Sequence, residues 1–217
     1  YHNERNAGVP ASLSTQVPVG LHVGHGVKQV STEKVHVTGN LQNTGNDLDI
    51  SIDGAGFFQI LQPNGIIAYS RDGHFNIDGQ GRLVTNDGMP VDPEINIPVD
   101  TRKVEISNDG TVSVFLRDET QPEAIGSLQL ARFQNPAGLT PIGKNLYVST
   151  PASGNAVLDS PAANGMGGLN QGFLEGSNVS LVEEMVNMIT AQRAYEVNSK
   201  AIQSSDEMLK TANGLIR

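Results

Sequence analysis

One short stretch of the sequence, DISIDGAGFFQI, places oxygen-bearing side chains where a calcium-binding loop would have them. Asp49, Ser51 and Asp53 stand at loop positions one, three and five, and Gly54 stands at position six. An EF-hand loop also needs a bidentate carboxylate at position twelve and a helix on each side. Position twelve here is Ile60, and the flanking residues alternate between apolar and polar types. The stretch is therefore more typical of a strand and a tight turn than of a metal site.

The alternation before this turn predicts a strand with one buried and one solvated face. Leu48, Ile50 and Ile52 share one face, because successive side chains of a strand point to opposite sides. The face expected to be wet carries Asp47, Asp49, Ser51 and Asp53. After the turn, Phe57 and Phe58 are adjacent, so one of them points inward in either orientation of the strand. We expect this pair to serve the core rather than an interface.

The other residues that could do chemistry are not arranged for it. His22 and His25 could offer two imidazoles, but no carboxylate or third histidine lies near them in the sequence. Glu183 and Glu184 are adjacent on a predicted helix, so their carboxylates point in different directions. No spaced nucleophile motif is present, and the glycines at 165–168 lack the lysine of a phosphate loop. The sequence predicts no enzyme, no metal and no other cofactor.

Composition and charge restrict the class of partner. The chain has 217 residues and a formal net charge of -9, which disfavours nucleic acid and anionic membrane surfaces. It contains no cysteine, which excludes a disulfide scaffold and cysteine metal sites. No apolar run is long enough for a membrane span, and no signal peptide heads the chain. Because the first residue is Tyr1 rather than methionine, we expect an N-terminal piece to be missing.

Turn signals and helix formers divide the sequence into three predicted regions. Residues 1–45 are poor in apolar residues and predict an extended, partly flexible arm. Residues 46–172 alternate short strand-like runs with turn dipeptides and predict an antiparallel β domain. These dipeptides are Asp53-Gly54, Asn64-Gly65, Asp72-Gly73, Asp78-Gly79, Asp87-Gly88 and Asp109-Gly110. Residues 173–217 predict one long C-terminal α-helix for assembly, so the expected fold class is mainly β.

The predicted helix begins with a capping box, Ser180-Leu-Val-Glu183, and is expected to run to about Ala212. At about 1.5 Å per residue it forms a rod of about 50 Å, too long to lie over a small β domain. Apolar residues recur at every seventh position and define what we call the helix seam: Leu181, Met188, Tyr195, Ile202, Leu209 and Ile216. Such a repeat keeps one stripe facing a partner helix. We expect that partner to be another copy or an absent part of the chain; the alternative is that the stripe packs on the β domain.

Several blocks of the sequence together resemble the rod, hook and basal-body family of the bacterial flagellum. They cover most of the chain, and distal rod proteins are the nearest branch. In chain order the blocks are TGNDLDISIDGAGFF (44–58), YSRDGHF (69–75), FQNPAGL (133–139), GKNLY (143–147), QGFLEGSNV (171–179) and EMVNMITAQRAYEVNSKAI (184–202). The last block is the most specific of them.

The resemblance implies a structural subunit of the flagellar rod that polymerises into the axial drive shaft and transmits torque from motor to hook. Its partners would be copies of itself, other rod, hook and ring subunits, and the flagellar export apparatus, with no membrane insertion. Export without a cleaved signal peptide would bring it to the basal body, where the shaft spans the periplasm. In the family an N-terminal helix packs beside the C-terminal one, and we expect this chain to lack it.

The resemblance also implies polar contacts between subunits along the last block, at Gln192, Arg193, Glu196, Asn198 and Lys200. A solvated helix face is the alternative for each of them. Other interpretations of the whole chain are a proximal rod or hook subunit, and a β-domain adhesin or carbohydrate-binding module. The module would have only four tyrosines and no tryptophan for stacking on sugars. A calcium-dependent module is the remaining alternative.

Overall fold

The computed structural model describes the backbone of residues 2–3, 10–12, 15–16, 22–23, 34–117 and 121–214. Side chains are described from Lys34 onward within these ranges, except at 209 and 212–214. Contacts divide the chain into two units, Tyr1–Lys34 and Val35–Arg217, which are described separately.

Short antiparallel strand pairs are the described features of the first unit. β1 (His2–Asn3) pairs with β4 (His22–Val23), and β2 (Pro10–Ser12) pairs with β3 (Thr15–Gln16). These strands fall in the predicted arm. The side chains of His22 and His25, the two histidines that are not predicted to bind a metal, lie outside the described residues.

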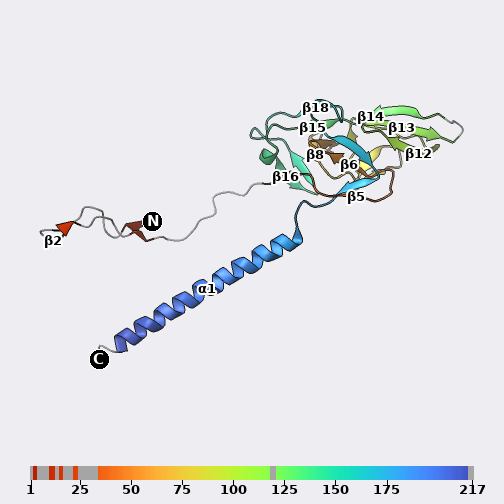
Figure 1. The fold of residues 1–217 in the computed structure, drawn as a ribbon. Coiled ribbons are helices and arrows are strands. Elements are labelled where there is room, and N and C mark those ends of the chain that lie inside the picture. Colours follow the sequence, from red (N-terminus) through yellow and green to blue (C-terminus); the bar gives the residue numbers. More distant parts are fainter. Residues whose placement is uncertain are drawn as a thin grey trace. The chain divides into compact units, whose positions relative to one another are not determined.

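Antiparallel strands dominate the second unit, which confirms the predicted fold class (Figure 1). The largest described sheet has the order β16–β17–β8–β7–β15–β18, and β11 pairs with β7 beside this path. The bounds of these strands are β7 Phe57–Leu61, β8 Ile67–Ser70, β11 Val91–Asp92, β15 Leu130–Arg132, β16 Thr140–Gly143, β17 Leu146–Val148 and β18 Val157–Asp159.

Smaller sheets complete the described part of the β domain. One has the order β12–β13–β14, and three others are the pairs β9–β10, β6–β19 and β5–β20. The last two pairs bring the beginning of this unit beside its later part. The bounds are β5 Leu41–Asn43, β6 Ile50–Asp53, β9 Phe75–Ile77, β10 Leu83–Thr85, β12 Thr101–Ile106, β13 Thr111–Leu116, β14 Glu123–Ser127, β19 Gly168–Gln171 and β20 Phe173–Glu175, with a 3-10 turn at Pro136–Gly138.

Strand β7 is buried on both faces, because its alternating side chains enter two different hydrophobic clusters. Phe58 belongs to the larger cluster and packs edge-on against Phe75, with 5.1 Å between the ring centroids. Phe57 belongs to the second cluster, which also holds Tyr69 and Phe133. Burial raises the pKa of Tyr69, and the charge of Asp92 raises it further. The prediction that Phe57 and Phe58 serve the core is confirmed.

The predicted solvated face of β6 is wrong at two positions. Asp49 and Ser51 are only 3% and 1% exposed, whereas Asp47 and Asp53 are exposed as predicted. Strand β19 pairs along β6, and the Ser51 hydroxyl donates a hydrogen bond of 3.4 Å to the Asn170 carbonyl. Alternation along one strand could not show that both of its faces would be covered.

The buried Asp49 carboxylate is held by polar partners from nearby turns. It accepts hydrogen bonds from the Thr44 hydroxyl at 2.6 Å and from the side-chain amide of Asn46 at 3.0 Å. The Nδ1 atom of His74 lies 2.6 Å from Asp49 Oδ1, the same oxygen that accepts from Asn46. These partners replace the water that a carboxylate loses on burial. The residue is therefore a structural link between the 44–49 turn and the start of β9, and no group of three or more metal-binding side chains occurs among the described residues.

The turn prediction holds at most of the glycine dipeptides and fails at one. Positive φ angles, which glycine adopts without strain, occur at Gly54, Gly65, Gly88 and Gly110. Asp72-Gly73 instead lies in an irregular connection between β8 and β9, and Gly73 has no positive φ angle. A Cβ atom on Gly73 would lie 1.6 Å from the carbonyl oxygen of Ile50, and the Gly73 carbonyl accepts a hydrogen bond from the Ile50 amide. Glycine is needed there for close backbone approach.

Replacing Gly73 with alanine is expected to lower the free energy of unfolding by more than about 2 kcal/mol, because a backbone segment of the core must move. Gly79→Ala is the matched control, since it changes a glycine after an aspartate where a Cβ meets nothing within 4 Å. The control should stay within about 0.5 kcal/mol of the parent. Urea denaturation followed by circular dichroism measures both, and equal midpoints for the two variants would contradict the close-approach argument.

Candidate assembly surface

The C-terminal helix α1 (Leu181–Gly214) is 34 residues long and unbroken (Figure 1). Its start is the predicted cap: the Glu183 amide donates to the Ser180 hydroxyl at 3.5 Å, and the Glu184 amide donates to the Ser180 carbonyl at 3.1 Å. Glu183 and Glu184 in the first turn interact favourably with the helix dipole. At about 1.5 Å per residue, α1 is about 50 Å long.

The described residues of the helix seam are uncovered in the single chain. Leu181, Met188, Tyr195 and Ile202 are between 62% and 78% exposed, although each is large and mainly apolar. Their spacing places them on one side of α1. The side chains of Leu209 and Ile216, the last two predicted seam residues, lie outside the described residues. Their place in the seam stays a prediction.

A second apolar stripe on α1 was missed by the heptad pattern. Each of its members lies one or two residues from a seam position, which places it about 100° to 160° around the helix axis. All four are 48% to 72% exposed: Val182, Val186, Ile189 and Val197. The spacing of Val182, Val186 and Ile189, at i, i+4 and i+7, was the available signal. A helix with apolar residues on more than one side is stable when neighbours cover more than one side.

The five predicted polar contact residues also lie on the exposed helix: Gln192, Arg193, Glu196, Asn198 and Lys200. No hydrogen bond or ion pair joins their side chains to another described residue. They are accessible to another molecule, and they share the helix with both apolar stripes.

Two segments form what we call the neck. Residues 173–180 lead from the β domain to α1, and residues 35–43 run beside them. Within the neck, the side-chain amide of Asn178 donates hydrogen bonds to the backbone carbonyls of Val35 and Val37 at 3.2 and 3.0 Å. The backbone amide of Gly176 donates to the Asn40 carbonyl at 2.8 Å, which extends the pairing of β5 and β20 by one residue on each segment. The two segments therefore run together as a hydrogen-bonded ribbon up to the start of the helix.

Arg71 fastens the neck to the β domain. Its Nε atom donates to Glu175 Oε2 at 2.8 Å, and the other oxygen of Glu175 accepts from the amide of Gly39 in the neck. The guanidinium also donates to the carbonyls of Gly54 and Gly56 at 3.0 and 3.1 Å. The Arg71 and Glu175 side chains are 15% and 11% exposed, so the ion pair is largely shielded from water.

His36 adds an aromatic contact from the neck to the second hydrophobic cluster. Its ring meets those of Phe57 and Tyr147 edge-on, at centroid distances of 5.6 and 5.2 Å. The neck is thus joined to the β domain by charge, by main-chain hydrogen bonds and by ring packing.

Comparison with known proteins identifies the two parts that meet at this ion pair. Residues 51–114 match the family described as flagellar hook protein FlgE/F/G D1 domain. Residues 170–215 match the family described as flagellar basal body rod FlgEFG protein C-terminal. Arg71 lies in the first match, and Glu175 and α1 lie in the second.

Similar proteins extend these matches over nearly the whole chain. The flagellar basal-body rod protein FlgG of Buchnera aphidicola (subsp. Acyrthosiphon pisum) is 49% identical over 215 residues, covering 99% of this chain and 83% of that protein. FlgG of Borreliella burgdorferi is 47% identical over 219 residues, covering 100% and 83%. FlgG of Bacillus subtilis is 40% identical over 200 residues, covering 90% and 75%.

The chain belongs to the flagellar basal-body rod family. The predicted family and the predicted role as a structural subunit of the distal rod are both confirmed by these relatives. Members of the family are structural proteins, and the exposed α1 lies in its C-terminal match. Among the described helical residues, we find no segment whose length and apolarity suit a membrane span.

Replacing Arg71 with methionine is expected to cost about 2–4 kcal/mol of unfolding free energy, because the largely buried Glu175 carboxylate loses its cation. Lys144→Met is the matched control: it removes an ion pair with Asp87 whose lysine is 69% exposed. That change should cost less than about 0.5 kcal/mol. Chemical denaturation measures both, and similar losses for the two variants would show that the Arg71 pair does not hold the neck.

Amide exchange should separate α1 from the β domain in the free chain. Because the described helix side chains are exposed, we expect opening free energies below about 2 kcal/mol along α1 and several kcal/mol in β7. Hydrogen–deuterium exchange with mass spectrometry gives both values. Equal protection of α1 and β7 would mean that the helix seam already packs on the β domain.

Proposed function

We propose that this rod subunit polymerises through α1 into a tubular axial shaft that carries torque from the motor to the hook. The observation that carries the proposal is a 34-residue helix whose large apolar side chains are exposed on two sides. A soluble subunit with such a helix gains stability when other helices cover it. A helix that has neighbours on both sides is typical of a close-packed wall of helices, whereas a single helix pair would cover only one side.

The energetics favour use of both stripes. Burying a large apolar side chain contributes about 1.5–3 kcal/mol, so Leu181, Met188 and Ile202 together contribute about 5–9 kcal/mol, and Tyr195 adds to this. Association costs about 4–15 kcal/mol in lost motional freedom. The helix seam alone would therefore assemble only marginally, whereas the second stripe adds a comparable gain. Assembly then becomes favourable when neighbours occupy both sides of the helix.

Polar contacts are proposed to set how neighbouring helices align. Gln192, Arg193, Glu196, Asn198 and Lys200 offer donors and acceptors without a described partner in the single chain. Buried or half-buried polar groups require matched partners, so they favour one alignment over a sliding apolar contact. In this role they would bind side chains of adjacent copies.

Membership in the rod family supports a proposed location and proposed further partners. We place the polymer in the flagellar basal body, with the shaft crossing the periplasm. The subunit is proposed to pass through the flagellar export apparatus without a cleaved signal peptide, and to contact other rod, hook and ring subunits. The role is structural and needs no cofactor or nucleic acid. The net charge of -9 disfavours nucleic acid as a partner.

A charge placed in the helix seam tests the proposal. Ile202→Lys should raise the critical concentration for assembly by more than about tenfold, because the lost burial exceeds about 1.4 kcal/mol. Gln203→Lys adds the same side chain at the adjacent position, which is already polar and is not part of the helix seam, and should have little effect. In a flagellated cell that lacks its own distal rod subunit, the first variant should abolish swimming and the second should support it.

Electron microscopy of purified basal bodies supplies the structural measurement. Rods should be absent or truncated with Ile202→Lys and normal with Gln203→Lys. Normal rods with both variants would refute assembly through the helix seam. Both proteins should show the same thermal unfolding of the β domain, because both positions lie on the exposed helix.

A further inference from the structure

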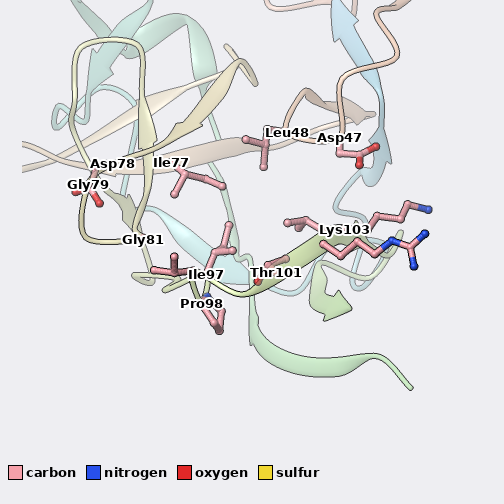
Figure 2. Close-up of a pocket in the computed structure, with 13 residues that line it drawn as sticks. Asp47, Leu48, Ile77, Asp78, Gly79, Gly81, Ile97, Pro98, Thr101 and Lys103 are labelled. Atoms are coloured by element: carbon pink, nitrogen blue, oxygen red, sulfur yellow. The ribbon is translucent and has the colours of Figure 1, made fainter. Parts of the chain in front are cut away.

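A groove on the β domain shares no lining residue with α1 or the neck. It has a volume of about 470 Å³ and is formed by the 47–48 turn, the end of β9 with its following turn, and the segment from Ile97 to Val104. Figure 2 shows Leu48 and Ile77 on one wall and Ile97, Pro98 and Thr101 on the other. Strand β12, which begins at Thr101, is an edge strand of its described sheet.

The groove combines apolar walls with positive charge. Ile77 is 43% exposed and Val99 is 97% exposed, so both present apolar surface to solvent. Arg102 and Lys103 at one end are exposed and form no ion pair with a described residue. This pairing of aliphatic surface and cations suits an apolar segment followed by a carboxylate.

The groove also carries two carboxylates, and neither forms an ion pair with Arg102 or Lys103 in the described part of the chain. Asp78 is engaged by Arg82, whose guanidinium nitrogen lies 2.8 Å from its carboxylate. Hydrogen bonds from the Arg82 amide, with a further contribution from Gln80, hold the pKa of Asp78 below its usual range. Asp47 is the other acidic residue of the lining, and Figure 2 shows it at the same end as Lys103.

A segment with the complementary chemistry lies on another part of the same domain. Strand β18 ends its described sheet, and its consecutive residues Val157 and Leu158 are 54% and 48% exposed. Because neighbouring side chains of a strand point to opposite faces, this edge is uncovered on both. Exposed aliphatic edge strands are surfaces that proteins usually cover.

The next residue of β18 supplies the charge. The Asp159 carboxylate accepts hydrogen bonds from the side chain of Asn164 and from the Ser160 amide. The Asn164 contact, followed by the Ser160 one, lowers the pKa of Asp159. The sequence of β18, Val-Leu-Asp, thus offers two aliphatic side chains followed by a carboxylate.

We propose that the β18 edge of one copy binds in the groove of the next copy, with Val157 and Leu158 on its apolar walls and Asp159 facing its cations. This contact rests on the proposed self-assembly and adds a second interface to the helix contacts. The groove and β18 share no residue, so each copy offers both halves. An interface of this heterologous kind repeats from copy to copy and suits a helical polymer.

A second copy suits the groove because its β18 carries both required features. The strand has two exposed aliphatic residues next to an ionised carboxylate, and the groove has exposed aliphatic walls next to two cations. Each surface therefore removes the exposure of the other.

Disulfide trapping tests the contact directly, because the chain contains no cysteine. One sample of the full chain carries Val99→Cys and another carries Val157→Cys; the two are mixed and mildly oxidised. A mixed disulfide dimer should form several-fold faster than with Ile142→Cys in place of Val157→Cys. Ile142 is the matched control because it is 49% exposed and lies on β16, at the other end of the sheet. Equal trapping with both partners, or none with either, would overturn the proposal.

Charge reversal provides an independent test of the same contact. Lys103→Glu should weaken self-association about fivefold, measured by sedimentation, because it places two negative charges together. A chain that carries Lys103→Glu and Asp159→Lys should recover the lost affinity, since each contact is again complementary. Glu105→Lys, on the same strand, is the control for a general charge effect. Failure of the double variant to recover, with its thermal unfolding unchanged, would overturn the assigned pairing.

The outcomes distinguish this contact from the proposed function itself. Intact rods in cells that carry Val99→Glu together with Leu158→Ser would refute the groove contact and would not affect the proposal of assembly through α1. Intact rods with Ile202→Lys would instead remove the helix proposal, and the trapped disulfide would still report the groove contact.

Discussion

Burial of the Arg71 guanidinium constrains much of the surrounding structure. A guanidinium has five N–H donors and cannot give up its proton, so a shielded arginine needs several acceptors in a plane. Here they are Glu175 and the carbonyls of Ile52, Gly54 and Gly56. The turn after β6, the end of β8 and the neck must therefore be correctly placed together, although they are far apart in the sequence.

The same arrangement explains why the two matched family regions form one structural part. Strand β6 pairs with β19, and β5 pairs with β20, so the later region completes sheets begun by the earlier one. Glu175 then accepts from Arg71 on one side and from the Gly39 amide on the other. The apolar helix and the groove beside β12 offer different kinds of contact, one through broad burial and the other through directional charge.

Local pattern was sufficient for much of this fold and insufficient where distant segments meet. Period-two alternation, glycine turns and the cap at Ser180 predicted the β domain and the start of α1. The burial of Asp49 depends on His74, and the need for glycine at position 73 depends on Ile50; neither partner is visible in a local window. The second stripe of α1 was visible in the sequence, but the choice of one heptad register concealed it. Arg71 and Glu175 carried no spacing signal, because their pairing is produced by the sheets.

The paired construction of the neck has a mechanical consequence. A single extended chain turns freely about its backbone bonds, so it would act as a swivel between the β domain and α1. In the neck, Asn178 ties its own segment to Val35 and Val37, and Gly176 ties it to Asn40. Rotation of one segment then strains the bonds to the other. A twist applied to α1 would therefore reach the β domain with less slack than it would through a single connecting chain.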